Sequence, residues 1–222
     1  DITNACLGTM SGIIDVANRI ELGQIKAGLV VSCEHARDIT QILIQRMVEE
    51  GTSEYFREAM ATMTGGSGAV GILLTDGSYE SDKPRLIGGV TMGAPQHFAM
   101  CRWGADKRIP ARAPQMMETN PIGMLKHGGE LIRKVGDAFF NEFNWTREEL
   151  DKIISHQVAA ANRDAIIANL GLTLDKDFST FPFLGNMGTV SLPVTAAIAE
   201  ERGILEHGQK VGFIGIGSVS IQ

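Results

Sequence analysis

Short apolar runs alternate with longer segments of helical periodicity along most of this chain of 222 residues, and this alternation restricts the fold more than any other feature. The run AGLVVSC at 27–33 is apolar throughout, which predicts a strand buried on both faces. Further strands are predicted at 69–75, 85–92, 152–155 and 210–216. Apolar strands that alternate with helices are typical of an α/β fold with a mainly parallel sheet, covered on both faces.

Helical periodicity and stop signals predict the helices between these strands. We expect helices at 6–22, 38–50, 54–62, 122–143, 159–170 and 189–202. Glycines follow three of them, at 23, 171 and 203. Thr146 to Glu149 has the pattern of a capping box, and the segment from Ala94 to Asn120 is expected to be irregular. The stretches GGSGAVGILLT and GFIGIGSVSIQ resemble each other, which suggests two related halves.

Charge and cysteine usage exclude several classes of protein. A net charge of −6 and a pI near 5.4 argue against a nucleic-acid or anionic-membrane partner. No apolar run approaches the roughly 20 residues of a membrane span, and no signal-peptide pattern is present. Three widely spaced cysteines form neither a disulfide framework nor a metal site, so we expect a cytoplasmic protein. The glycine stretches lack the order of elements that a nucleotide site needs.

Cys6 stands where a predicted helix begins, in the opening stretch DITNACLGTMSG. A free cysteine most often acts as a small hydrophobic side chain and is packed away. A helix N-terminus, however, lowers the pKa of a thiol and makes it a nucleophile. Both interpretations of Cys6 stay open at this point.

His156 is the histidine with the most informative surroundings, KIISHQVAAANRDAI. It follows a short apolar strand and precedes a helix, and ligands of open α/β sheets bind at that edge. A histidine with a purely structural role would fit the same place. His35 also follows a strand, so position alone does not separate the two. The other three histidines (His97, His127 and His207) lie in polar or irregular surroundings and are expected to be exposed.

Asn186 lies between glycines in FPFLGNMGTVSLP. Asn in such a place usually forms a turn, but a tight turn also aims an amide into a cleft, where it is a good oxyanion donor. Cys6, His156 and Asn186 together fit two chemistries. Papain-like proteases use Cys, His and Asn for acyl transfer, and acyl-thioester condensing enzymes use Cys for the acyl group and His with Asn for an enolate.

Local sequence distinguishes the two. The opening stretch resembles the nucleophile segment of β-ketoacyl synthase III enzymes of the thiolase superfamily, and ISHQ resembles the histidine motif of that family. LGNMGTVSLPV is similar to its asparagine motif, and GFIGIGS to its glycine-rich strand near the active site. The four motifs occur in family order over nearly the whole chain, whereas the nucleophile motif of papain-like proteases is absent.

The resemblance implies a thiolase-like fold, layered α-β-α-β-α with duplicated halves, and a homodimer. In the family about a third of the protein precedes the nucleophile, whereas five residues precede Cys6, so we expect this chain to lack most of the N-terminal half. Residues 1–84 would be the remainder of that half and carry the nucleophile. Residues 85–222 would be the C-terminal half with His and Asn.

The resemblance also assigns roles. Cys6 would be acylated, with its thiolate stabilised by the helix that begins there. His156 and Asn186 would hold the carbonyl oxygen of the second substrate, and the backbone N–H groups of Cys6 and Ile216 would form the oxyanion hole. Many members read HQxN, whereas Ala159 occupies that Asn position here.

Within the family, NACLG, ANRIELGQI and TMTGGSGAVGILL look more like the OleA branch, which joins two fatty acyl-CoA molecules head to head into a 2-alkyl-3-oxoalkanoic acid. One alternative is a 3-oxoacyl-ACP synthase III that joins a short acyl-CoA to malonyl-acyl carrier protein. An alternative of another class is a non-catalytic partner subunit with the same fold. The resemblance implies acyl-CoA or acyl carrier protein as partner and no metal or nucleotide cofactor.

Overall fold

The structure is a computed structural model that describes residues 1–79, 83–105 and 115–217. The α-helices are α1 Gly8–Glu21, α2 Arg37–Glu50, α3 Ser53–Met63, α4 Pro121–Glu142, α5 Ala160–Leu170, α6 Phe181–Leu184 and α7 Ser191–Glu201. The strands are β1 Ala27–Glu34, β2 Gly68–Thr75, β3 Cys101–Ala105, β4 Gln115–Thr119, β5 Lys152–Ser155 and β6 Val211–Ile214. Short 3-10 helices are η1 Pro95–Met100, η2 Leu174–Lys176 and η3 Gly188–Val190.

The strands of the described residues form three pairs. β1 with β2, and β3 with β4, are antiparallel, whereas β5 and β6 are parallel and align Ser155 with Ile214. The prediction of a mainly parallel sheet was therefore wrong for the described pairs. The alternation of strands and helices indicated an α/β fold correctly, but the direction of a pairing depends on chain crossings that a run of apolar residues does not encode.

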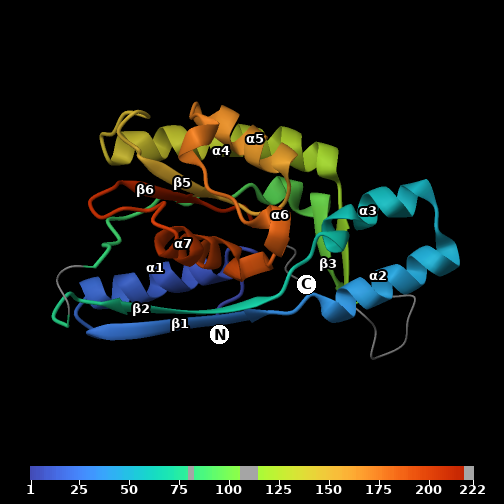
Figure 1. Cartoon of the computed structure of the whole chain (residues 1–222), viewed down its shortest axis with the longest axis horizontal. Helices are drawn as coiled ribbons and strands as arrows, with labels where there is room; N and C mark the ends of the chain where they lie inside the picture. Colours follow the sequence, from blue (N-terminus) through green and yellow to red (C-terminus); the bar gives the residue numbers. More distant parts are fainter. Residues whose placement is uncertain (80–82, 106–114, 218–222) are drawn as a thin grey trace.

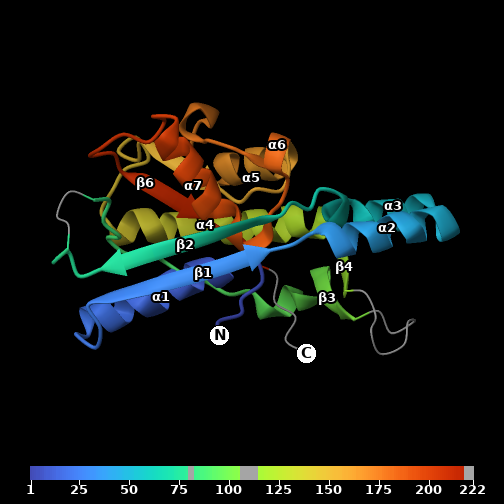
Figure 2. The ribbon, with the colours of Figure 1, turned by 60° about the horizontal axis from the view of Figure 1, so that its bottom comes forward.

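The elements lie in layers. Figure 1 shows the β1–β2 pair below α1 and α7, the β5–β6 pair above these helices, and α4 with α5 above that pair. The turned view in Figure 2 shows β1 and β2 running side by side, with α2 and α3 extending beyond one end of them. The described residues thus show four successive layers, in the order β-α-β-α. The expected order of the complete fold is α-β-α-β-α.

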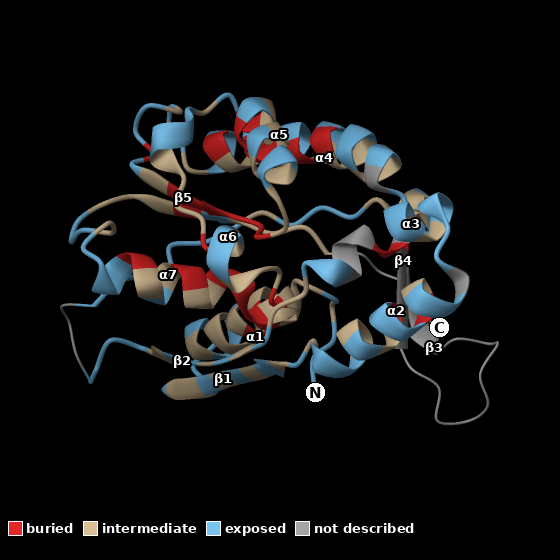
Figure 3. Ribbon diagram, turned by 45° about the vertical axis from the view of Figure 1, so that its right-hand side comes forward, coloured by how far each residue is buried: buried red, intermediate tan, exposed pale blue. Residues whose placement is uncertain are grey.

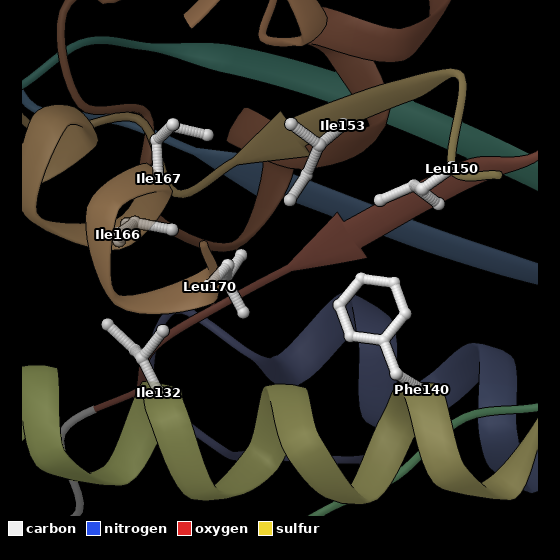
Figure 4. Packing of buried hydrophobic residues seen from close by; sticks show 7 residues of the cluster. All are labelled: Ile132, Phe140, Leu150, Ile153, Ile166, Ile167 and Leu170. Carbon is white, nitrogen blue, oxygen red and sulfur yellow. The ribbon is translucent and has the colours of Figure 1, made fainter. Parts of the chain in front are cut away.

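β5 is the centre of the core because it is covered on both faces. Ile153 packs with residues of α4 and α5, and Figure 4 shows this cluster: Ile132, Phe140, Leu150, Ile153, Ile166, Ile167 and Leu170. The next residue, Ile154, points to the opposite face and packs with Leu192 and Ala199 of α7. A short strand with consecutive apolar residues is explained by this double cover.

The β1–β2 pair is covered on one face only. Val30 faces α1 so closely that a Cβ at Gly12 would lie 2.9 Å from its side chain. Leu29 and Val31, on either side of Val30 in the strand, point to the opposite face and are 62% and 69% exposed. Leu73, which pairs with Leu29 on β2, is 66% exposed. Figure 3 accordingly shows β5 coloured as buried and β1 and β2 in the colours of intermediate and exposed residues. The prediction that 27–33 is buried on both faces was wrong, because no described element covers the outer face.

Most other element predictions were confirmed within two residues, α5 with its left-handed Gly171 among them (φ 68°). One predicted strand, 85–92, is not a strand, because no described segment offers its backbone a hydrogen-bonding partner. The expected irregular segment 94–120 contains η1, β3 and β4, and its residues 106–114 lie outside the described residues. Thr146 N–H donates to Glu149 Oε2 as in a capping box, yet no helix follows.

The boundary between residues 84 and 85 stays a prediction, and residues 218–222 of the second glycine-rich stretch lie outside the described part. Among the described helices, none combines the length and the apolar character that crossing a membrane would require.

Candidate active site

The site forms where several chain segments end. His156 follows β5 directly, and the parallel register places the segment after Ile214 of β6 at the same edge. A Cβ on Gly217 would lie 3.2 Å from Leu7 and 3.1 Å from the carbonyl oxygen of Asn4, and Leu7 also fills the space beside Gly215. The segment with Ile216 therefore lies against the residues on either side of Cys6.

Cys6 lies in a tight turn just ahead of α1 rather than inside the helix. Ala5 has a positive φ of 43°, and the N–H groups of Leu7 and Gly8 donate to the carbonyl oxygens of Asn4 and Ala5. A left-handed residue other than glycine is uncommon and marks a backbone held by its surroundings. The helix itself begins at Gly8, so the predicted start at residue 6 was two residues early.

The thiol of Cys6 is protonated at neutral pH. Burial raises its pKa to about 11, with the neighbouring Cys101 and Glu34 as further causes, and the hydrogen bond of its own backbone N–H lowers it less. The expected stabilisation of the thiolate by the helix start is thus outweighed. Loss of water around the sulfur disfavours the anion more than one N–H group favours it.

His156 is a buried neutral imidazole. It is 7% exposed, whereas His35 at the end of β1 is exposed, so burial separates two histidines that position in the sequence could not. Burial lowers the pKa of His156 to about 4. Its Nδ1 atom is buried and has no hydrogen-bond partner among the described residues. The histidines 97 and 127, expected to be exposed, are half-buried and stack at 4.3 Å.

Gln157 fixes the backbone around His156. Its Oε1 accepts hydrogen bonds from the N–H groups of Thr180 and Phe181 at 2.7 and 3.0 Å, and its Nε2 donates to the carbonyl oxygen of Ser155 at 2.6 Å. The hydroxyl of Thr180 is 2.6 Å from that of Thr195 on α7. This buried chain of hydrogen bonds ties the end of β5 to the helix that follows Asn186.

Asn186 is both a turn residue and an available amide donor. Its Oδ1 accepts from the N–H of Gly188 at 3.0 Å, as an Asx turn does. Its backbone N–H donates to Thr64, and its carbonyl oxygen accepts from Gly66, both at 2.7 Å. Because Oδ1 is occupied, the Nδ2 amide is the group that remains to donate to a ligand.

Hydrogen bonds connect the asparagine turn to the helix beside Cys6. Thr189 Oγ1 accepts from the N–H of Thr9 at 2.7 Å and lies 3.0 Å from its hydroxyl. The N–H of Thr189 donates to Glu34 at the end of β1 at 3.2 Å. Sequence reasoning named Cys6, His156, Asn186 and Ile216 but missed Glu34, Thr9, Thr189 and Gln157. Gln157 and Glu34 each adjoin a histidine that was considered, which was the only sequence signal.

We also looked for metal ligands and cavities among the described residues. Within the described ranges, no group of three or more His, Cys, Asp or Glu side chains is placed to hold a metal ion. An open cavity of about 570 Å³ lies between the end of α4 and the loop that follows it, lined by Asp137, Phe140, Asn141, Trp145, Thr146, Arg147 and Glu148. None of the predicted site residues lines this cavity.

Comparison with known proteins relates the sequence and the fold of this chain to one class. Residues 140–218 match the family described as 3-oxoacyl-[acyl-carrier-protein] synthase III C terminal. A solved structure of Xanthomonas campestris OleA with bound lauric acid and lauroyl-CoA superposes with a TM-score of 0.89 at 31% identity, over 98% of this chain and 62% of that one. A 3-oxoacyl-(acyl carrier protein) synthase III from Xanthomonas oryzae gives a TM-score of 0.88 at 30% identity, over 98% of this chain and 62% of that one. The chain thus has the thiolase-like fold of β-ketoacyl synthase III-type condensing enzymes and is related to them in sequence.

Among these relatives, the chain is more similar to the acyl-CoA:acyl-CoA alkyltransferases than to the synthases III. It is 49% identical to an acyl-CoA:acyl-CoA alkyltransferase of Shewanella oneidensis over 98% of its length, which is 63% of that protein. It is 32% identical to the enzyme of the same name from Xanthomonas campestris, over 98% of this chain and 62% of that protein. A β-ketoacyl-[acyl-carrier-protein] synthase III of Neisseria gonorrhoeae is 23% identical. The chain therefore spans somewhat less than two thirds of the length of these relatives.

Proposed function

We propose that this chain is the part of an acyl-thioester condensing enzyme that carries its Cys, His and Asn, and that the enzyme joins two fatty acyl-CoA molecules head to head. The observation that carries the proposal is that the Cys6 turn is joined to the Asn186 turn through Thr9 and Thr189. The Cys6 turn also lies against the segment after β6, whose partner strand β5 ends at His156. The sequence identity of 49% to an acyl-CoA:acyl-CoA alkyltransferase favours this branch.

The ionisation of the site argues for condensation over a papain-like reaction. A papain-like protease holds a thiolate beside an imidazolium, which needs a low thiol pKa and a raised histidine pKa. Here burial moves both groups the other way, Cys6 to about 11 and His156 to about 4. A neutral imidazole and a neutral thiol suit a histidine that donates a hydrogen bond.

In the first half-reaction the sulfur of Cys6 attacks the carbonyl carbon of an acyl-CoA. The new bond joins that carbon to Sγ, the bond to the CoA sulfur breaks, and the thiol proton of Cys6 ends on CoA. The N–H groups of Cys6 and Ile216 hold the oxygen on which negative charge develops. Removal of one such donor typically slows a reaction about 10²- to 10³-fold.

In the second half-reaction the α-carbon of another acyl-CoA loses a proton to a base and attacks the acyl group on Cys6. The N–H of neutral His156 and the Nδ2 amide of Asn186 donate to the enolate oxygen. The carbon–carbon bond forms as the bond to Sγ breaks, and Cys6 regains a proton. The product is a 2-alkyl-3-oxoacyl-CoA, and hydrolysis of its thioester gives the 2-alkyl-3-oxoalkanoic acid.

The surroundings of the enzyme follow from this chemistry. The thioesters are already activated, so the steps require no metal, nucleotide or redox cofactor. We take acyl-CoA as the substrate, a homodimer as the assembly and the cytoplasm, where CoA thioesters are made, as the location. A second candidate is a 3-oxoacyl-ACP synthase III, favoured by the family match of residues 140–218 and the fold of the Xanthomonas oryzae enzyme.

Intact-protein mass spectrometry of the full-length protein tests the proposal. After incubation with acyl-CoAs of increasing length, we expect the mass to rise by one acyl group, with long chains preferred. The adduct should be absent in Cys6→Ala and present in the control Cys33→Ser, because Cys33 is exposed and outside the site. A preference for acetyl-CoA with product only from malonyl-acyl carrier protein would favour the second candidate. No adduct with any acyl-CoA would contradict the catalytic proposal and favour a non-catalytic subunit.

A further inference from the structure

Glu34 is a carboxylate at the junction of the candidate site that the proposed reaction does not use. It is the last residue of β1 and is half-buried. Its Oε1 accepts a hydrogen bond from the N–H of Thr189 at 3.2 Å. Its carboxylate lies so close to the asparagine turn that a Cβ on Gly188 would be 3.0 Å from Oε1. A side chain at that glycine would displace it.

Thr189 transmits this contact to the segment of Cys6. Its backbone is held by Glu34, and its hydroxyl by both the N–H and the hydroxyl of Thr9, at 2.7 and 3.0 Å. Thr9 is 2% exposed, so water does not compete for these bonds. Three segments far apart in the sequence therefore meet at one residue: the end of β1, the asparagine turn and the first turn of α1.

The orientation of Asn186 depends on the same turn. Its Oδ1 is fixed by the N–H of Gly188, and the next N–H along the chain, that of Thr189, is the one held by Glu34. If the Glu34 contact is lost, the two N–H groups of this turn are no longer anchored together. The direction of the Nδ2 amide then changes with the turn.

We propose that Glu34 is a positioning residue: its carboxylate oxygen anchors the N–H of Thr189 and thereby sets the Asn186 amide relative to Cys6. This inference deepens the proposed function and rests on it. A small displacement of a positioning group costs about 10²-fold in rate, although the group never touches the substrate. Because Asn186 takes part in condensation only, we expect the loss of Glu34 to slow the condensation half-reaction more than the acylation of Cys6.

The thiol supplies a separate readout. The charge of Glu34 is one of the causes that raise the pKa of Cys6. Removing that charge in Glu34→Ala and Glu34→Gln lowers the pKa of the thiol, so acylation should be no slower in these two variants. A merely structural role would slow both half-reactions together, whereas the positioning role separates them.

The test compares Glu34→Ala, Glu34→Asp and Glu34→Gln in the full-length protein, with Glu21→Ala on the exposed end of α1 as control. Acylation is followed by mass spectrometry with lauroyl-CoA, and condensation by product formation. Glu34→Gln keeps an accepting oxygen at the same reach and should condense within about threefold of the wild type. Glu34→Ala should lose about 10- to 100-fold in condensation with acylation retained, and Glu34→Asp should lie between them.

Two results would overturn the inference: condensation by Glu34→Ala at the wild-type rate, or an equal loss in Glu34→Gln and Glu34→Ala. If Glu34→Ala does not fold, the comparison of Glu34→Asp with Glu34→Gln decides. If the wild type itself forms no adduct, the proposed function fails. The positioning role is then judged from crystal structures, in which Asn186 should move in Glu34→Asp and keep its place in Glu34→Gln. An unmoved Asn186 in both variants would reject it.

Discussion

A thiol with a pKa near 11 is an unusual resting state for a nucleophile, and the cause lies in single atoms. Burial of the Cys6 thiol is the largest cause, and the neighbours that act on its charge, Cys101 and Glu34, also disfavour an anion. The hydrogen bond of its own backbone N–H, which lowers the pKa, is the smallest cause. The thiol that we propose as the nucleophile is therefore protonated at neutral pH.

This state predicts how Cys6 reacts with an alkylating reagent. In a Cys33→Ser background, the rate of alkylation of Cys6 by iodoacetamide should rise about tenfold per pH unit and keep rising beyond pH 9, because only the thiolate reacts. Mass spectrometry of the peptide that contains Cys6 follows the rate. A plateau near pH 8.5, the value of an ordinary thiol, would contradict the effect of burial.

At this scale the sequence named candidate site residues but did not predict their ionisation. The residue types of Cys6, His156 and Asn186, and the motifs around them, were enough to name them. Whether a helix start or burial governs a thiol depends on which side chains surround it, and these come from distant parts of the chain. Glu34 and Thr189 are 155 residues apart, so no local pattern could have joined them.

Glycines show how one element constrains another. Gly215, just after β6, lies beside Leu7, and a Cβ there would also be 3.1 Å from Leu192. Gly128 in α4 has nothing within 4 Å of an added Cβ. The same substitution therefore meets close packing at one position and open space at the other.

Gly215→Ala should lower the free energy of unfolding by about 1–3 kcal/mol, because an extra methyl group in a filled space forces its neighbours to move. Gly128→Ala should raise it by about 0.5–1 kcal/mol, since alanine is the better helix former and meets no neighbour. Urea titrations of both variants measure the two effects. Equal effects would mean that Leu7 does not occupy the space beside Gly215.

Elements were predicted well where the pattern was local and less well where it was not. β5 was predicted with its bounds, and α5 within one residue, because apolar runs and a terminal glycine are local signals. The antiparallel pairing of β1 and β2 and the absence of a strand at 85–92 depend on which neighbours are available. Propensity alone does not decide that.

Protonation of the buried imidazole of His156 makes the stability of the whole molecule depend on pH. The pKa of His156 is about 4 in the folded state and about 6.5 in an unfolded chain, so the unfolded state binds more protons between these values. The free energy of unfolding should therefore fall as the pH drops from about 6.5 to about 4, by up to about 3 kcal/mol.

Thermal or urea unfolding at several pH values measures this slope, and His156→Asn should reduce it. The exposed His35 serves as the matched control, because His35→Asn should leave the slope unchanged. An unchanged slope in His156→Asn would mean that another group governs acid stability. The stability at neutral pH of each variant provides the reference for both comparisons.

The layered architecture could be expected from the alternation of elements and the family resemblance, and the described residues show four of its layers in sequence. What the sequence did not predict was the one-sided cover of β1 and β2. An apolar run indicates that a side chain avoids water. It does not indicate which element, or which chain, provides the cover.

The position of Leu7 between the Cys6 turn and the glycines after β6 also has a consequence for the order of folding. The two segments are about 200 residues apart, and contacts of such separation form late because a long loop must close first. During synthesis, which proceeds from the N-terminus, Cys6 emerges long before the strand that completes its surroundings. For that interval it is an ordinary solvent-exposed thiol, and the newborn chain is more easily oxidised at this position than the finished protein.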